Sequence, residues 1–318
     1  MINTLTIPVA DSLAELSGDI VLAIGVFDGV HRGHQRVFQT LHTLAEECAA
    51  TPVALFFDPP PRVVLRPQDP APLLVTWQEK VRLLAEQGVK IAVKFAFTRE
   101  FAAESPEAFV QQQLLGNPAL RIHAICVGTE WRFGAGGAGD VSRLQSLTAS
   151  AGVRVVPVEP LLFQNERISS TRIRKALLQG DFPLATQMLG RPFTLTGQVV
   201  HGMGKAATDL HCPTANLDNE GLLLPPYGVY AARTRVQEGA SLPGIVYIGD
   251  APTFRGEGNG HPIVELHLFQ DAGDLYGKPI RVEPVRFLRE SRVFPSHQAL
   301  ADQIQTDIRH AKEALEIR

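Results

Sequence analysis

The hydrophobic periodicity of this chain changes near residue 190, and this change constrains the fold more than any other feature. In the first half, short apolar runs alternate with helical patterns, and the runs at 20–25, 52–57, 89–95, 122–128 and 153–158 are predicted strands. A helix is predicted over 34–49, because apolar residues recur every three or four positions at Val37, Leu41, Leu44 and Cys48. This alternation predicts an α/β domain with a doubly wound parallel sheet and helices on both faces.

The second half has period-two patterning instead. After a helical stretch over 170–189, GRPF at 190–193 is predicted to be a linker. The runs at 193–201, 229–236, 242–248, 263–269 and 280–287 predict strands of an antiparallel sheet or small β-barrel. A terminal helix should follow, with its apolar stripe at Leu300, Ile304, Ile308, Ala311 and Leu315. The 318 residues allow two domains, which we place at 1–186 and 187–318.

The amino-acid composition limits the classes of binding partner and the cellular compartment expected for this chain. The net charge is −3, and no Lys/Arg cluster is interleaved with aromatic residues, so nucleic acid is not expected. Cys48, Cys126 and Cys212 are far apart and fit a reducing cytoplasm. No basic leader and no apolar run of about 18 residues is found, so we expect no membrane partner. The oligomeric state has no signal in the sequence.

The stretch GVFDGVHRGH at 25–34 places Asp28, His31 and His34 among glycines at the end of a predicted strand. A zinc site needs three or four ligands, whereas HxxH offers two, and two core histidines in one turn would both need buried partners. A helix N-terminus presents N–H groups and partial positive charge, and Gly29 and Gly33 allow a phosphate to approach closely. We therefore favour phosphate binding at the carboxyl edge of the parallel sheet.

A second candidate phosphate site is ISSTRIR at 168–174. Ser169 or Ser170 would cap a helix, Thr171 adds a hydroxyl, and Arg172 and Arg174 bring cations to the same end. An ordinary capped helix with solvated arginines is the alternative.

The glycine-rich segment GAGGAG at 134–139 fits GxGxxG spacing. A dinucleotide-binding fingerprint must follow its strand directly, but TEWRF separates this segment from the strand at 122–128. A dinucleotide site is therefore not favoured here.

Oxygen donors stand out in the second half. In PTAN at 213–216, Thr214 and Asn216 carry hard oxygens suited to Mg²⁺, although this tetrapeptide by itself could be a plain turn. Just before it, Gly202, Gly204 and Lys205 form a loop of the kind that covers phosphates.

The strand IVELHLF at 263–269 has two different faces. Glu265 and His267 share one face, opposite Val264, Leu266 and Leu268. A solvated face is the default interpretation for the two polar residues.

These motifs together resemble a known family. HRGH matches the HxGH signature of the nucleotidyltransferase superfamily, and GVFDGVHRGH resembles its FAD synthetase branch. FFDPPPR at 56–62, VGTEWRFG at 127–134 and ISSTRIR are similar to further blocks of that branch, in order. PTAN, YIGDAPTF at 247–254, VELHL at 264–268 and DLYGK at 274–278 resemble riboflavin kinase. Nearly the whole chain is thus similar to the bifunctional bacterial riboflavin kinase/FAD synthetase family.

For the first domain, the resemblance implies that the phosphate of FMN attacks the α-phosphate of ATP, giving FAD and pyrophosphate. His31 and His34 would be catalytic by neutralising the charge that builds up, with Mg²⁺. Trp131 and Phe133 would face the flavin or the adenine. The implied contacts with ATP and its phosphates are at Gly25, Phe27, Asp28, Gly33, Ser170, Thr171 and Arg174.

For the second domain, the resemblance implies transfer of the γ-phosphate of ATP to the riboflavin 5′-hydroxyl. Glu265 would be the general base, and Thr214 and Asn216 would hold Mg²⁺. Two alternatives stay open: an FMN adenylyltransferase whose second domain only binds flavin, and a flavin-binding or regulatory protein without turnover.

Several positions depart from the family pattern. We predict that they alter affinity or rate and leave both activities in place. The departures are Val26 for Asn, Pro60 for His, Glu130 and Trp131 for Asp-Phe, His211 and Cys212 for Gly-Phe, Tyr247 for Asn, and Ala251 for Arg.

Overall fold

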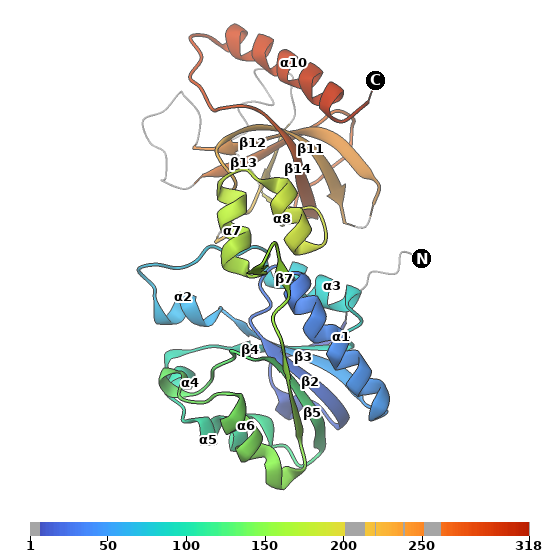
Figure 1. Cartoon of the computed structure of the whole chain (residues 1–318). Helices are drawn as coiled ribbons and strands as arrows, with labels where there is room; N and C mark the ends of the chain where they lie inside the picture. Colours follow the sequence, from blue (N-terminus) through green and yellow to red (C-terminus); the bar gives the residue numbers. More distant parts are fainter. Residues whose placement is uncertain (1–6, 201–213, 220, 238, 251–261, 318) are drawn as a thin grey trace. The chain divides into compact units, whose positions relative to one another are not determined.

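The computed structural model describes residues 7–200, 214–219, 221–237, 239–250 and 262–317, which divide into two compact units (Figure 1). The first unit contains the described residues up to 72 together with 77–170, and the second contains 73–76 and the described residues from 171 onward. Residues 171–186 therefore group with the second unit. The domain boundary between 186 and 187 stays a prediction.

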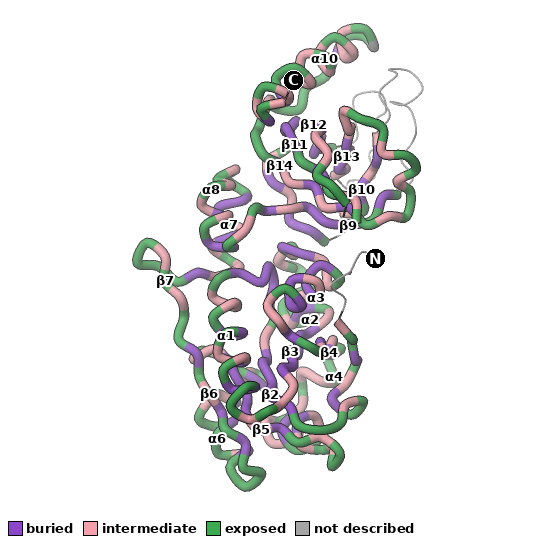
Figure 2. Tube along the Cα trace, turned by 90° about the vertical axis from the view of Figure 1, so that its right-hand side faces the viewer, coloured by how far each residue is buried: buried purple, intermediate pink, exposed green. Residues whose placement is uncertain are grey.

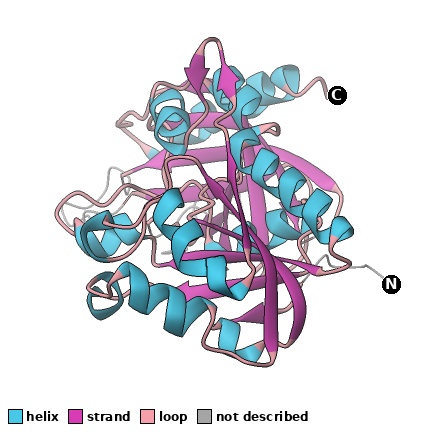
Figure 3. Cartoon of the chain, turned by 60° about the horizontal axis from the view of Figure 1, so that its bottom comes forward, coloured by secondary structure: helices cyan, strands magenta, loops and turns pink. Residues whose placement is uncertain are grey.

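The first unit is built on the parallel sheet predicted from the sequence. Its six strands have the order β1-β4-β3-β2-β5-β6, and every neighbouring pair is parallel. Figure 3 distinguishes the strands, in magenta, from the helices, in cyan. The strands are β1 (Val9–Ala10), β2 (Gly18–Gly25), β3 (Thr51–Asp58), β4 (Ile91–Ala96), β5 (Leu120–Gly128) and β6 (Arg154–Val158). The five predicted strands are confirmed, with ends shifted by up to two residues, and β1 was not foreseen.

Both faces of this sheet are buried. On β2, Ile20, Leu22 and Ile24 join one apolar layer, and the intervening Val21 and Ala23 are equally buried on the other face. The central strands accordingly form the buried interior of the unit in Figure 2. A strand buried on both faces has a continuous apolar run in its sequence, and these strands could therefore be predicted from the sequence.

Helices and short elements surround the sheet. The predicted helix over 34–49 is α1 (Arg32–Glu47), whose buried side chains face the sheet. The other elements of this part are η1 (Leu13–Glu15), α2 (Pro61–Leu65), α3 (Trp77–Glu86), α4 (Arg99–Ala102), α5 (Pro106–Ala108), the π-helical η2 (Phe109–Leu114), η3 (Ala135–Gly137), α6 (Val141–Thr148), η4 (Ala149–Ala151), and the hairpin β7 (Leu162–Phe163) and β8 (Glu166–Arg167).

The second unit contains a closed antiparallel barrel, as the period-two runs predicted. The strand order is β10-β13-β12-β11-β14-β9. The strands are β9 (Leu195–Val200), β10 (Ala215–Leu217), β11 (Gly228–Val236), β12 (Ser241–Gly249), β13 (Ile263–Leu268) and β14 (Pro279–Arg289). The terminal helix is α10 (His297–Ala314), and its Ala311 packs against Val229, Ala231 and Ile245 on the outside of the barrel.

The stretch predicted to be helical over 170–189 forms two helices. These are α7 (Ser170–Leu178) and α8 (Phe182–Leu189). Gly180, with φ +72°, lies between them, and Gly190, with φ +76°, ends α8 in the left-handed conformation. Across the described part of the chain, no helix has the length and apolar character needed to cross a membrane.

Candidate functional site

The turn between β2 and α1 has an unusual backbone. Phe27, Gly29 and Val30 have φ values of +51°, +78° and +40°, and the left-handed region is costly for a β-branched valine. A Cβ atom at Gly25 would lie 2.7 Å from the Phe27 ring, so the glycine permits this ring to fold back into the core. There Phe27 packs against Phe38, with ring centroids 4.8 Å apart.

Both histidines of the motif lie at the first turn of α1. His31 is the N-cap, and its Nδ1 accepts a hydrogen bond of 3.3 Å from the His34 backbone N–H. A neutral ring that accepts at Nδ1 carries its hydrogen on Nε2 and can donate from there. The two rings stack with centroids 3.6 Å apart, and a Cβ at Gly33 would come within 3.1 Å of the His31 ring. The structure thus brings His31, His34 and Gly33 together.

Side chains from three elements hold alternate carbonyl groups of this turn. The Val26 oxygen accepts from Lys80 Nζ at 2.9 Å, the Asp28 oxygen from Ser170 Oγ at 2.9 Å, and the Val30 oxygen from the Gln35 amide at 3.0 Å. The ISSTRIR segment therefore reaches the HRGH turn through Ser170. Thr171 and Arg174 follow in α7 within the second unit, so their placement against the histidines stays a prediction.

Lys80 in α3 was not singled out from the sequence. It is 3% exposed, and its ammonium lies 4.6 Å from the centroid of the Phe56 ring. Burial lowers the pKa of Lys80, and the negative charges of Asp28 and Asp58 oppose that shift. The available signal was its position four residues before Leu84, which is buried on the same side of α3.

Trp131 and Phe133 stack beyond the end of β5. Their centroids are 4.8 Å apart and their planes differ by 15°, and Phe133 also contacts Phe109. Phe133 is buried, whereas Trp131 is half-buried and presents more surface to a ligand. A Cβ at Gly139 would lie 2.5 Å from the Phe133 ring, which gives a glycine of the GAGGAG segment a packing role.

On the barrel, Thr214 and Glu265 are in direct contact. The Thr214 hydroxyl donates a hydrogen bond of 2.5 Å to Glu265 Oε1. Asn216 and Tyr247 are the residues opposite Glu265 on the two neighbouring strands. Val264 and Leu266 are buried and point into the barrel, so Glu265, on the opposite face of β13, lies on the outer face.

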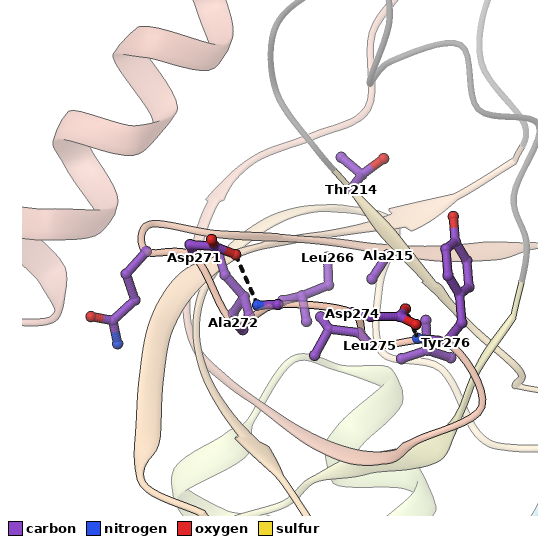
Figure 4. A pocket seen from close by; sticks show the side chains of 12 residues that line it. Thr214, Ala215, Leu266, Asp271, Ala272, Asp274, Leu275 and Tyr276 are labelled. Atoms are coloured by element: carbon purple, nitrogen blue, oxygen red, sulfur yellow. Dashed lines mark hydrogen bonds between the residues drawn. The ribbon is translucent and has the colours of Figure 1, made fainter.

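A cavity of about 250 Å³ opens beside Thr214 (Figure 4). The loop over 270–276 forms much of its wall, and β10 and β13 contribute Ala215 and Leu266. Two aspartates shape this loop, because Asp271 accepts from the Gly273 N–H at 2.8 Å and Asp274 accepts from the Tyr276 N–H at 3.0 Å. The DLYGK motif thus borders the same cavity as the threonine of PTAN.

Some predicted site residues lie outside the described residues. These are Gly202, Gly204 and Lys205, together with the family departures His211, Cys212 and Ala251. Among the residues that the structure does describe, no group of three or more His, Cys, Asp or Glu is arranged to hold a metal ion.

Three other residues that depart from the family pattern lie in the described part of the structure, and their contacts are as follows. Val26 is 38% exposed and uses its carbonyl group for Lys80. Pro60 precedes α2 at its N-cap position. The Tyr247 hydroxyl donates to the Asp250 carbonyl at 2.9 Å and lies 2.9 Å from Ser291 Oγ.

Comparison with known proteins gives matches over both units. A family model described as FAD synthetase matches residues 13–172, and one described as riboflavin kinase matches 189–315. The bifunctional riboflavin kinase/FMN adenylyltransferase of Bacillus subtilis is 34% identical over 92% of this chain and 91% of its own length. The protein of that name from Escherichia coli K12 is 36% identical, with 92% of each chain covered.

A similar fold is found among solved structures. The crystal structure of a protein named macrolide-efflux protein from Streptococcus pneumoniae matches with a TM-score of 0.76 and 27% identity. The match covers 97% of this chain and 99% of that chain.

Proposed function

This chain belongs to the bifunctional riboflavin kinase/FMN adenylyltransferase family, and on that premise we propose which of its residues carry each reaction. The two reactions are phosphorylation of riboflavin by ATP to give FMN, and adenylylation of FMN by ATP to give FAD and pyrophosphate. Both family models match the chain, so neither the single-activity reading nor the non-enzymatic reading has support.

We assign adenylylation to the turn between β2 and α1. A phosphate oxygen of FMN attacks the α-phosphorus of ATP, and the bond to the pyrophosphate oxygen breaks. Negative charge then builds up on the oxygens around the α-phosphorus, where positioned donors lower the barrier. The observation that carries this assignment is the His31 ring at the N-terminus of α1, whose Nδ1 accepts the His34 N–H, so that a neutral ring carries its hydrogen on Nε2. Trp131 is assigned to the flavin ring.

We assign riboflavin phosphorylation to the outer face of the barrel at Glu265. The hydrogen bond from Thr214 identifies Oε1 as an acceptor, which is what a general base must be. Oε2 takes the proton from the riboflavin 5′-hydroxyl as that oxygen attacks the γ-phosphorus, and ADP leaves. The cavity beside Thr214 is the candidate site for one of the two substrates.

Mg²⁺ is implied for both reactions. The hydroxyl of Thr214, just before β10, and the amide oxygen of Asn216 in β10 are hard oxygen donors beside the Glu265 carboxylate, and such donors fit Mg²⁺. When bound, Mg²⁺ neutralises charge on the phosphates of ATP. Thr214 and Asn216 are assigned as its protein ligands. We also propose a cytoplasmic location, supported by three widely separated cysteines.

Glu265→Gln tests the assignment of the kinase site. The amide keeps the shape of the side chain but cannot take a proton, so riboflavin phosphorylation should fall by about 10²–10⁴-fold, the usual contribution of a general base. FAD formation from supplied FMN should stay within about twofold, because His31, His34 and Trp131 lie in the other unit. Flavin products are separated by chromatography.

His267→Gln is the matched control, since His267 lies on the same face of β13, two residues along. It should keep both activities. Phosphorylation that survives in Glu265→Gln removes Glu265 as the base.

A further inference from the structure

Lys80 is a buried cation to which the proposed reaction assigns no role. Its side chain comes from α3, is 3% exposed, and ends against the backbone of the phosphate-binding turn, 54 residues earlier in the chain. A buried ammonium loses its hydration, so a chain retains one where it forms compensating interactions. Here these are the 2.9 Å hydrogen bond to the Val26 carbonyl, the Phe56 ring at 4.6 Å, and the negative charges of Asp28 and Asp58.

The hydrogen bond fixes the orientation of a peptide unit. In a trans peptide the C=O and the following N–H point in opposite directions, so a carbonyl of Val26 held toward Lys80 directs the Phe27 N–H away from it. The carbonyls of Asp28 and Val30 are held in the same way by Ser170 and Gln35. Three alternate carbonyl groups are thus engaged by side chains.

This arrangement sets the backbone of the turn. Phe27, Gly29 and Val30 all have positive φ, and successive N–H groups in such turns form concave sites for anions. A conformation this unfavourable for phenylalanine and valine persists only where its surroundings hold it. Lys80 is the charged member of the three side chains that do so, and the turn that it holds leads directly into the His31 cap.

We infer that Lys80 is a positioning residue for FMN adenylylation, whose ammonium fixes the turn over 26–30 so that its N–H groups and the histidines meet the phosphates of ATP. The inference rests on the assignment of adenylylation to this turn. Lys80 contacts the turn and is too buried to be assigned to substrate.

Lys80→Met tests this inference, because methionine fills similar space without the charge or the donor. The kcat of FAD formation from FMN, per folded molecule, should fall at least about tenfold, since positioning acts on the transition state. Riboflavin phosphorylation by the same molecules should stay within about twofold. Tryptophan fluorescence gives the folded fraction, because Trp77 and Trp131 both belong to the first unit. A side chain that only supported folding would lower that fraction and leave kcat per folded molecule unchanged.

Two further variants complete the test. Lys80→Arg restores the charge and the donor, and it should be at least about fivefold more active than Lys80→Met. Lys94→Met is the matched control, because Lys94 also lies over an aromatic ring, 4.7 Å from the centroid of Trp77, on β4 of the same unit. It should leave FAD formation unchanged. Should Lys80→Met not fold, Lys80→Gln, which is shorter and uncharged, replaces it under the same limits.

The results distinguish failure of the role of Lys80 from failure of the assignment of adenylylation to this turn. A Lys80→Met kcat within about threefold of the unaltered chain, or Lys80→Arg no better than Lys80→Met, overturns the role of Lys80. If His31 and His34 variants retain FAD formation, the assignment of this turn fails, whatever Lys80 does.

Discussion

Replacing His31 separates two roles that the structure gives this side chain. Its Nδ1 caps α1 by accepting the His34 N–H, and its ring stacks on His34 at 3.6 Å. Loss of a cap costs about 1 kcal/mol of stability, and loss of an aromatic contact costs about 1 kcal/mol more. His31→Ala loses both, so the first unit should be destabilised by about 2 kcal/mol. His31→Asn keeps an oxygen at the cap and should lose about 1 kcal/mol.

The two variants should be equally inactive in adenylylation. Neither carries an imidazole donor, and removal of one such donor typically lowers kcat by about 10²–10³-fold. FAD formation from FMN should therefore fall by that factor in both, with riboflavin phosphorylation unchanged. Urea unfolding followed by tryptophan fluorescence reports on the first unit alone, because it holds both tryptophans, Trp77 and Trp131.

Three results would refute parts of this reasoning. If His31→Asn and His31→Ala unfold at the same urea concentration, the cap contributes nothing. If His31→Asn forms FAD within about threefold of the unaltered rate, the His31 ring does not act on the phosphates. If both variants also lose riboflavin phosphorylation, the two reactions do not use separate residues.

Three other perturbations have definite expected outcomes. Trp131→Leu should raise the KM for FMN in FAD formation about tenfold, which corresponds to about 1.4 kcal/mol of lost stacking; an unchanged KM removes Trp131 from the flavin site. Asp307→Leu leaves Arg289 without the carboxylate that binds it at 2.8 Å. The second unit should lose about 3 kcal/mol of stability, measured as heat inactivation of the kinase at a lower temperature. Adding Arg289→Met to the same chain should restore much of that stability. Cys126 should react with iodoacetamide only after unfolding, as mass spectrometry can show, whereas half-buried Cys48 reacts earlier. Burial raises the pKa of the Cys126 thiol to about 12, above its value in the unfolded chain. The contribution of the neutral thiol to folding stability is therefore present at pH 7 and is lost as the pH rises from 9 toward 12. Labelling of Cys126 before unfolding would contradict this prediction.

The strands of the first unit were predictable because both of their faces are buried. An uninterrupted apolar run such as that of β2 can be recognised from the local sequence alone. By contrast, β10 has only three residues, Ala215–Leu217, and β1 has two, so neither has enough length for a period to be visible. The break at Gly180 within the predicted helical stretch was missed for a related reason, since a single glycine is tolerated in many helices.

The site was only partly predictable. His31, His34 and Gly33 are neighbours in the sequence, and their meeting at a helix N-terminus follows from the strand-to-helix pattern. The contact between Thr214 and Glu265 joins residues 51 positions apart, and the resemblance to a family was needed to name either one. The role of Lys80 rests on its contact with the Val26 carbonyl, and a pattern of side chains in the sequence does not predict a contact with a backbone group.

The most direct test of the account mixes two variants that are each defective in one reaction. Glu265→Gln should form FAD from FMN but not from riboflavin, and His31→Asn should convert riboflavin only to FMN. Neither variant alone, with ATP and Mg²⁺, should convert riboflavin to FAD, whereas an equimolar mixture should do so, because FMN made by one variant is adenylylated by the other. A mixture that stops at FMN, or a single variant that carries out both steps, would contradict the assignment of one reaction to each set of residues.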